Sequence, residues 1–309
     1  MHGWIILDKP IGLGSTQAVA AVKRNLREAG FGKIKVGHGG TLDPLASGVL
    51  PIALGEATKL CGRMLDASKT YDFTISFGNE TSGLDAEGEV VATSDHRPTL
   101  ADIEAILPDF TGPIEQIPPA YSAIKIDGKR AYDLARAGEN VEMKARSVTI
   151  HFLRVFVSSC DQNNLAKRHE DTKKLKLITL SADVSKGTYI RSLARDIAYA
   201  LGTVGHVSML RRTRAGPFTL DNAISLDKLN SLGHGAAQED IILPMEAGLV
   251  DIPALDLSPE QARAVQQGRV LTGIAMKDGL HVARGVDLRP LALVENIDGI
   301  LKTVRGFNL

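Results

Sequence analysis

The chain has little cysteine, few aromatic side chains and no metal-binding pattern of histidines. Only two of the 309 residues are cysteines, Cys61 and Cys160, and the eight histidines form neither an HxH nor an HExxH pair. Two isolated cysteines build neither a disulfide framework nor a zinc site of the usual spacing. We therefore expect reduced thiols, no bound metal and no cofactor.

Long apolar runs are also missing. A membrane helix needs about 20 consecutive apolar residues, and the first apolar run is short because it ends at Asp8, Lys9 and Pro10. We expect neither a membrane span nor a signal peptide, and hence a cytoplasmic protein. A hydrophobic content of 44% is nevertheless enough for a large buried core.

The net charge is zero in total, but the charges are segregated along the chain. Residues 1–36 hold six Lys and Arg against two acids, residues 186–216 hold six against one, and residues 78–116 hold nine acids and one arginine. This segregation predicts basic faces and an acidic back, which suits a polyanionic ligand. A solvated surface without a partner is the alternative that composition leaves open.

The residues around Asp43 combine loop-forming residues with an apolar run typical of a buried core. Residues 36–51 read VGHGGTLDPLASGVLP, so glycines precede the acid and Pro44 follows it. Glycine permits positive φ and a close approach of the backbone, and proline keeps Asp43 out of a helix. The apolar run at residues 45–54 predicts core beside the carboxylate. An ordinary Asp-Pro turn is the alternative, but the glycines and His38 favour a site that something large approaches.

Periodicity predicts an α+β fold. We expect strands at residues 3–8, 69–77, 89–93, 148–157 and 174–184, and helices at residues 15–29, 56–65, 99–107, 189–201 and 258–268. The expected N-caps are Ser15 or Thr16, Thr99 and Ser258. Short strands near residues 270, 281, 291–294 and 301–305 predict a small β module at residues 250–309, after a larger domain at residues 1–249.

Two segments carry clustered cations. Residues 118–130 read PPAYSAIKIDGKR, a stiff start followed by an aromatic and by Lys125, Lys129 and Arg130. This composition predicts an arm at about residues 113–147 that grips a nucleic-acid backbone, with a plain strand and turn as the alternative. In the second segment Arg191 and Arg195 are four apart and therefore share a helix face. Such arginines are commonly only solubilising charge, but two basic clusters that flank one helix are less usual. The residues that accompany them are Tyr189, Leu210, Arg211, Arg212 and Arg214.

Taken together, these segments resemble the TruB family, the stand-alone bacterial tRNA pseudouridine-55 synthases. The matching segments are the LDKP run at residues 7–10, GHGGTLDPLASGVLP, KTY at residues 69–71, residues 118–130, KGTYIRSLARD from residue 186 and LRR at residues 210–212. Six segments in the same order are highly specific. The C-terminal part is similar to the PUA-like RNA-binding modules found in that family.

The resemblance implies a pseudouridine synthase fold with a mixed central β-sheet, and isomerisation of uridine to pseudouridine at position 55 in the T loop of tRNA. By resemblance Asp43 is the catalytic aspartate, Tyr71 stacks on the target base and Arg191 pairs with Asp43. Breaking a glycosidic bond and closing it again on carbon requires one positioned carboxylate and no cofactor. Further substrate-binding residues are Tyr189, His38, Lys9 and Leu210.

The target uridine is stacked inside the T loop, so binding must flip it out of the stack. His38 is expected to fill the vacated space, with a hydrogen-bonded structural imidazole as the alternative. Guide-RNA-dependent relatives lack the arm, so we expect no guide RNA, and we expect a monomer. The expected contacts to RNA phosphates come from Lys125, Lys129, Arg130, Arg211, Arg212 and Arg214.

Two other functions compete with this prediction. A hydrolase with a carboxylate nucleophile normally needs a second acid, and the Asp43 loop offers none. A non-catalytic RNA-binding or tRNA-folding protein would need the basic segments but neither Asp43 nor Tyr71.

Overall fold

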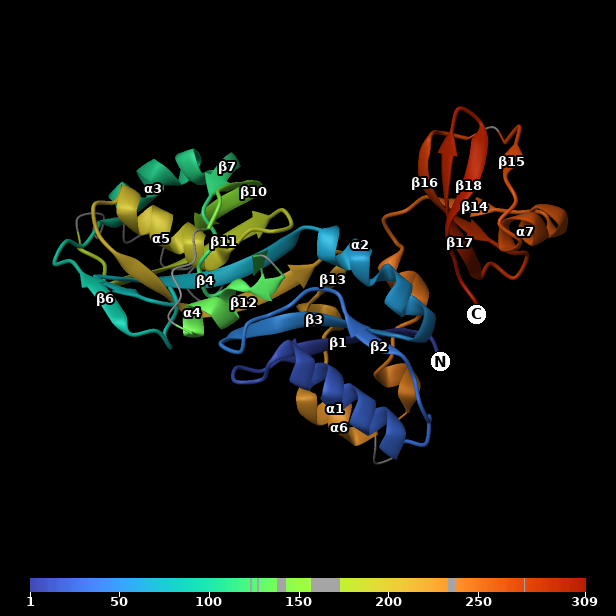
Figure 1. Ribbon diagram of the computed structural model, residues 1–309, viewed down its shortest axis with the longest axis horizontal. Coiled ribbons are helices and arrows are strands. Elements are labelled where there is room, and N and C mark those ends of the chain that lie inside the picture. Colours follow the sequence, from blue (N-terminus) through green and yellow to red (C-terminus); the bar gives the residue numbers. More distant parts are fainter. Residues whose placement is uncertain (123, 127, 138–142, 157–172, 233–236, 275) are drawn as a thin grey trace, which may run out of the picture. The chain divides into compact units, whose positions relative to one another are not determined.

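The computed structural model describes residues 1–122, 124–126, 128–137, 143–156, 173–232, 237–274 and 276–309. These residues, whose helices and strands are labelled in Figure 1, form two compact units. The first unit comprises Met1–Asp43, Val49–Leu65 and Ala215–Leu309, and the second comprises Pro44–Gly48 and Asp66–Arg214. Within the described ranges, no helix is long and apolar enough to cross a membrane.

The first unit is built around the N-terminal strand β1 (Gly3–Lys9). Trp4 donates from Nε1 to the carbonyl of Met245 at 3.2 Å, and its ring centroid lies 5.2 Å from that of Phe218. The same buried cluster includes Val282 and Leu293 from the C-terminal part of the chain. The N-terminal strand and the C-terminal residues therefore share one core. Other elements with residues in this unit are β2 (Val36–His38), η1 (Gly55–Leu60), α2 (Cys61–Asp66), β13 (Phe218–Thr219), η5 (Leu220–Asn222), η7 (Gln238–Asp240) and η8 (Met245–Gly248).

Helix α1 (Ser15–Glu28) lies beside α6 (Leu226–Ser231) in this unit (Figure 1). Asn25 donates from Nδ2 to Asn230 Oδ1 at 3.0 Å, which joins the two helices. The predicted cap of α1 is wrong, because Gly14 is the N-cap and its amide donates to Gln17 Oε1 at 2.7 Å. Ser15 is instead the first residue of the helix, and its hydroxyl bonds elsewhere.

The second unit contains a mixed sheet with the strand order β3-β12-β4-β11-β10-β7. Strand β12 pairs with β3 in parallel, whereas β4, β11, β10 and β7 pair antiparallel. Strand β3 continues into the first unit, where it pairs with β2. This arrangement agrees with the predicted mixed sheet, but β3 itself was expected only as core. The strands are β3 (Ala46–Leu54), β4 (Lys69–Phe77), β7 (Gly112–Gln116), β10 (Arg146–Val155), β11 (Leu177–Val184) and β12 (Gly205–Ala215).

Helices α3 (Leu100–Ile106) and α5 (Ile190–Ala200) bury apolar residues against β4 and β11 in one cluster that includes Phe73, Leu180 and Leu193. The predicted cap of α3 is confirmed, since Thr99 Oγ1 accepts from the amide of Asp102 at 3.2 Å. The remaining elements of this unit are β5 (Asn79–Thr81), β6 (Val90–Thr93), η2 (Leu107–Phe110), β8 (Lys125–Ile126), β9 (Lys129–Arg130) and α4 (Ala131–Arg136).

The C-terminal part forms a five-stranded sheet with the order β14-β16-β17-β18-β15. Helix α7 (Pro259–Gln266) packs on it, and Ser258 is confirmed as its cap because Ser258 Oγ accepts from the amide of Gln261 at 3.3 Å. A separate small cluster includes Leu257, Val265 and Val294. The division into domains at residues 1–249 and 250–309 stays a prediction. The strands are β14 (Ala254–Asp256), β15 (Leu271–Thr272), β16 (Gly279–Arg284), β17 (Pro290–Ile297) and β18 (Ile300–Gly306).

Candidate active site

The backbone next to Asp43 is held by hydrogen bonds to the buried hydroxyl of Ser15 in the first unit. Ser15 Oγ donates to the carbonyl of Leu42 at 2.9 Å and accepts from the amide of Leu42 at 2.8 Å. Two such bonds from one side chain satisfy both polar groups of a loop residue and fix its orientation. The first residue of α1 therefore positions the residue that precedes the candidate carboxylate.

The glycines before Asp43 serve two different purposes. Gly40 has φ of +133°, a conformation that side chains rarely adopt, so the predicted positive φ is confirmed there. Gly39 is needed for close packing, because an added Cβ would lie 2.5 Å from Met64 Cβ. The loop thus depends on glycine for its path and for its contact with α2.

Lys9 and His38 also lie in the first unit. Lys9 is fully buried, and its Nζ donates to the carbonyls of Leu13 at 2.6 Å and Pro10 at 3.0 Å, which closes the turn after β1. His38 ends β2, where it pairs with Ile52 of β3. Lys9 therefore stabilises a turn, and the contacts of both residues with a substrate stay predictions.

In the second unit Arg191 is buried and bound by three oxygens. Its side chain donates from Nη1 to the carbonyl of Gly83 at 2.8 Å and to Asp85 Oδ2 at 3.0 Å, and from Nη2 to the carbonyl of Tyr121 at 2.9 Å. A planar guanidinium held this way is fixed in orientation. The predicted pairing of Arg191 with Asp43 stays a prediction, since the two residues belong to different compact units.

Asp85 is a partner of the predicted site residue Arg191 that sequence reasoning missed. It lies in the acidic segment 78–116, which the charge pattern assigned to the back of the molecule. A signal was present, because the acid stands between Gly83 and Gly88 in a short loop, as Asp43 does among its own glycines. At least one acid of this segment therefore forms an ion pair with a predicted site residue, Arg191.

Helix α5 and the residue before it also bind the N-terminal part of the predicted arm, at Gln116 and Ile117. Ser192 Oγ donates to the carbonyl of Ile117 at 2.8 Å, Arg195 Nη2 donates to the same carbonyl at 3.1 Å, and the amide of Tyr189 donates to Gln116 Oε1 at 2.8 Å. Arg191 and Arg195 thus point at protein backbone from the first turns of one helix. Residues 123, 127 and 138–142 of the arm, and the side chains of Lys125 and Arg130, lie outside the described residues, whereas Lys129 is exposed.

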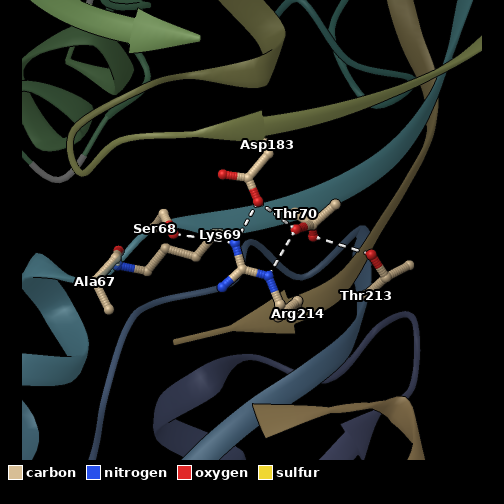
Figure 2. A network of polar contacts seen from close by, with 7 residues as sticks. All are labelled: Ala67, Ser68, Lys69, Thr70, Asp183, Thr213 and Arg214. Carbon is tan, nitrogen blue, oxygen red and sulfur yellow. Dashed lines mark hydrogen bonds and ion pairs between the residues drawn. The ribbon is translucent and has the colours of Figure 1, made fainter. Parts of the chain in front are cut away.

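The start of β4, which carries Tyr71, is fixed by a polar network around Arg214 (Figure 2). Arg214 donates from Nε to Thr70 Oγ1 at 3.0 Å, and from Nη2 to Ser68 Oγ at 3.0 Å. It also forms an ion pair with Asp183, whose Oδ2 accepts from Thr70 Oγ1 at 2.7 Å. Tyr71 follows Thr70 directly, is half-buried and packs against the core cluster of the unit.

The three arginines of β12 are placed differently from one another. Arg212 is 1% exposed, so its side chain is closed to solvent in this structure, and its contact with a phosphate stays a prediction. Arg211 is half-buried and donates to Ser47 Oγ at 3.3 Å. Arg211 and Arg214 stay candidates for phosphate contact, and Leu210 pairs with Ala46 beside the core.

Lys69 has an unusual protonation equilibrium. Burial, aided by the charge of Arg212, lowers the pKa of the Lys69 ammonium to about 8, while its Nζ donates to the carbonyl of Ala67 at 2.6 Å. Sequence reasoning noted Lys69 only as part of a motif. In the part of the chain that the structure describes, no group of three or more His, Cys, Asp or Glu side chains could hold a metal ion.

The fold is that of the pseudouridine synthases. The solved "Structure of H/ACA RNP bound to a substrate RNA containing 2'-deoxyuridine" matches with a TM-score of 0.71 at 24% identity, covering 99% of this chain and 85% of that chain. At this identity the likeness shows the fold alone, and it confirms the predicted fold class.

The sequence comparisons define the family. Residues 25–190 match the TruB family pseudouridylate synthase (N terminal domain), and residues 191–250 match the tRNA pseudouridylate synthase B C-terminal domain. The chain is 66% identical to tRNA pseudouridine synthase B of Novosphingobium aromaticivorans over 309 residues, covering 100% of this chain and 98% of the relative. It is 54% identical to the protein of that name from Zymomonas mobilis, covering 100% of this chain and 96% of the relative.

The chain therefore belongs to the TruB family and is an enzyme of the pseudouridine synthase class. The predicted family and enzyme class are confirmed.

Proposed function

We propose that the protein isomerises uridine to pseudouridine at position 55 in the T loop of tRNA, with Asp43 as the catalytic carboxylate. The observation that carries this proposal is the pinned loop, in which Ser15 fixes Leu42 beside Asp43 and Gly40 supplies the left-handed turn. The relatives named tRNA pseudouridine synthase B support tRNA as the substrate.

The reaction breaks the C1′–N1 bond, turns the uracil and joins C1′ to C5. The proton that leaves C5 is balanced by the proton that N1 gains, so neither an oxidant nor a reductant is consumed. The Asp43 carboxylate acts as nucleophile or as proton acceptor, as carboxylates do when a glycosidic bond breaks. Arg191 orients this carboxylate, and Asp85 holds Arg191 in place.

Binding requires the uridine to leave its stack, and contacts to the RNA must offset the cost of about a few kcal/mol. Tyr71 stacks on the flipped base, and His38 occupies the space that the base vacates. Tyr189 and Leu210 complete the base pocket, and Lys9 stabilises the turn after β1. The arm grips the stem, and the enzyme acts as a monomer without a guide RNA in the cytoplasm.

The test of the catalytic role uses tRNA transcripts labelled with tritium at C5 of uridine, since isomerisation releases that hydrogen. The wild-type protein is expected to release tritium, and Asp43→Asn is expected to release none while it still binds tRNA, because an amide neither attacks nor accepts the proton. Asp95→Asn, an exposed acid of the same type, is the matched control and should behave as wild type. Turnover by Asp43→Asn would remove Asp43 from the catalytic role.

The position is tested with a transcript that carries cytidine in place of uridine 55. The expected result is no release of tritium from the T loop. Release at the wild-type rate from this transcript would refute position 55 while leaving the role of Asp43 intact.

A further inference from the structure

Five cations at the end of α1 and in the turn after it have no part in the function proposed so far. Every one of them is exposed, and among the residues that the structure describes none makes a hydrogen bond or ion pair through its side chain. We call this set the α1 basic patch. It consists of Lys23, Arg24, Arg27, Lys33 and Lys35.

The local charge is strongly positive. The acids on α1 and on the adjoining helix α6 are Glu28 and Asp227, which offset only part of the five positive charges. Exposed cations that are close in space and not neutralised by acids repel one another. This repulsion is relieved by a polyanion, and neutralising phosphates releases the counterions of the nucleic acid.

The patch is connected directly to the candidate active site. Helix α1 begins at Ser15, whose hydroxyl holds Leu42 next to Asp43. With a rise of 1.5 Å per residue, Lys23 and Arg27 lie about 12 and 18 Å from Ser15 along the helix axis. The patch is therefore too far away to contact the reacting nucleotide, but it lies within reach of the same RNA molecule. Figure 1 shows α1 beside α6 in the first unit.

The other face of α1 excludes a membrane as the ligand. Ala18, Val22 and Leu26 are buried in the core of the first unit, so the helix has no free apolar face to insert into a bilayer. A polyanion in solution fits the exposed face, and the substrate of the enzyme is itself a polyanion.

We infer that the α1 basic patch binds phosphates of the tRNA that lie outside the T stem-loop. This inference rests on the proposed function, because it takes tRNA as the substrate and the T loop as the reacting part. The patch contributes to the affinity for whole tRNA and leaves the chemical step unchanged, since none of its residues touches the reacting nucleotide.

The test compares two RNAs, a whole tRNA transcript and the isolated T stem-loop, in filter-binding experiments over a range of salt concentrations. The variant is Lys23→Gln/Arg24→Gln/Arg27→Gln, which removes three positive charges from exposed helix positions. The matched control is Lys173→Gln/Lys174→Gln/Lys176→Gln, which removes three exposed charges next to the acidic segment. A second variant, Lys33→Gln/Lys35→Gln, changes the patch outside the helix.

For whole tRNA, Kd of the triple patch variant should rise about tenfold, and the slope of log affinity against log salt should fall by about 2. Lys33→Gln/Lys35→Gln should change both in the same direction. For the T stem-loop, all variants should match wild type, as should the control with either RNA. Single-turnover rates at saturating enzyme should be unchanged.

Wild-type affinity of both patch variants for whole tRNA would overturn the inference. An equal loss with the T stem-loop would also overturn it, because the patch would then contact the T arm itself. Failure of the proposed function gives a different result, since the wild-type enzyme would then release no tritium from the T loop of either RNA.

Discussion

At the scale of single residues, the orientation and protonation of side chains in recognised motifs depend on partners that no motif marks. Arg191 was predicted as a site residue, but its orientation comes from Asp85 and from two backbone carbonyls. Lys69 belongs to a recognised motif, yet its lowered pKa follows from burial and from the charge of Arg212, which sequence does not reveal. Sequence patterns therefore identified candidate site residues more readily than the partners that set their orientation or their pKa.

Replacing Asp85 with asparagine is expected to slow the reaction without abolishing tRNA binding. The substitution removes the ionic partner of Arg191 but leaves the carbonyls of Gly83 and Tyr121, so the guanidinium becomes less well fixed. A misplacement of about 1 Å can cost about 100-fold in rate. Single-turnover kinetics should show a loss of about 10- to 100-fold, and Glu87→Gln, an exposed acid of the same loop, should show none. Wild-type rates in Asp85→Asn would mean that Asp85 does not position Arg191 for catalysis.

Lys69 is expected to make the free energy of unfolding change with pH in the alkaline range. Its pKa is lowered from 10.5 to about 8 in the folded protein, so between these values the unfolded chain binds a proton that the folded chain has lost. The free energy of unfolding therefore rises with pH over this range, by at most about 1.4 kcal/mol per pH unit. Relative to Lys69→Met, the wild type should gain stability in urea unfolding from pH 8 to pH 10. A constant difference between the two proteins would show that Lys69 has an ordinary pKa.

At the scale of elements, the sequence predicted those segments whose pattern admits one interpretation. The strand at residues 69–77 coincides with β4, because its polar and apolar residues alternate. Thr99 and Ser258 cap their helices, each in a capping box with the side chain three residues later, Asp102 or Gln261. Strand β3 was missed, because a continuous apolar run fits a buried strand or a buried helix equally well. Ser15 was misassigned because its hydroxyl is used by the Asp43 loop, a contact between segments far apart in sequence.

Gly48 is a second case in which a contact between segments far apart in sequence could not be predicted. Its φ is +102°, and an added Cβ would lie 2.1 Å from the carbonyl oxygen of Arg212 across the β3·β12 ladder. The sequence predicted backbone freedom before Asp43 and assigned residues 45–54, which include Gly48, only to the core. The reason for glycine at this position, a close approach of two parallel strands, could come only from the structure.

The ion pair of Arg214 with Asp183 joins β12 to β11 and, through Thr70, to β4, and its removal is expected to destabilise the second unit. Arg214→Met leaves Asp183 largely buried without its cation, which costs about 3 kcal/mol. Arg284→Met is the matched control, because its partner Asp256 is exposed and such surface pairs contribute less than about 1 kcal/mol. Urea unfolding of both variants measures the difference. Equal losses would show that the Arg214 pair behaves as a surface ion pair.

At the scale of the whole molecule, the net charge of zero conceals the segregation of basic and acidic segments along the chain. The basic segments were visible once the chain was divided, and they drew attention to α5 and the arm. Arg191, Arg195 and Arg214 bind protein oxygens, whereas the side chains of the α1 basic patch do not within the described ranges. Charge clusters in a sequence therefore indicate basic segments, but burial and pairing decide which cations are available to RNA.

The C-terminal module is the part whose independence the sequence could not establish. The pattern of short strands predicted a separate module, and the observed sheet with α7 agrees with that in its elements. However, Val282, Leu293 and Phe307 belong to the cluster that contains Trp4, and Lys59 donates to the carbonyl of Gly306 at 2.8 Å. Removing the module therefore exposes apolar surface of the first unit.

Truncation after Val250 is accordingly expected to lower stability as well as tRNA affinity. Burying one large apolar side chain contributes about 1.5–3 kcal/mol, so loss of three such contacts should lower the melting temperature by about 10 °C or more. In the full chain, Phe307→Ala should reproduce part of this loss, at about 3–5 kcal/mol. Val304→Ala is the matched control and should have little effect, since Val304 is 54% exposed and lies on β18, the strand that ends just before Phe307. If the truncated protein melted at the wild-type temperature, residues 250–309 would be an independent domain, and the shared core would not contribute to the stability of the catalytic part.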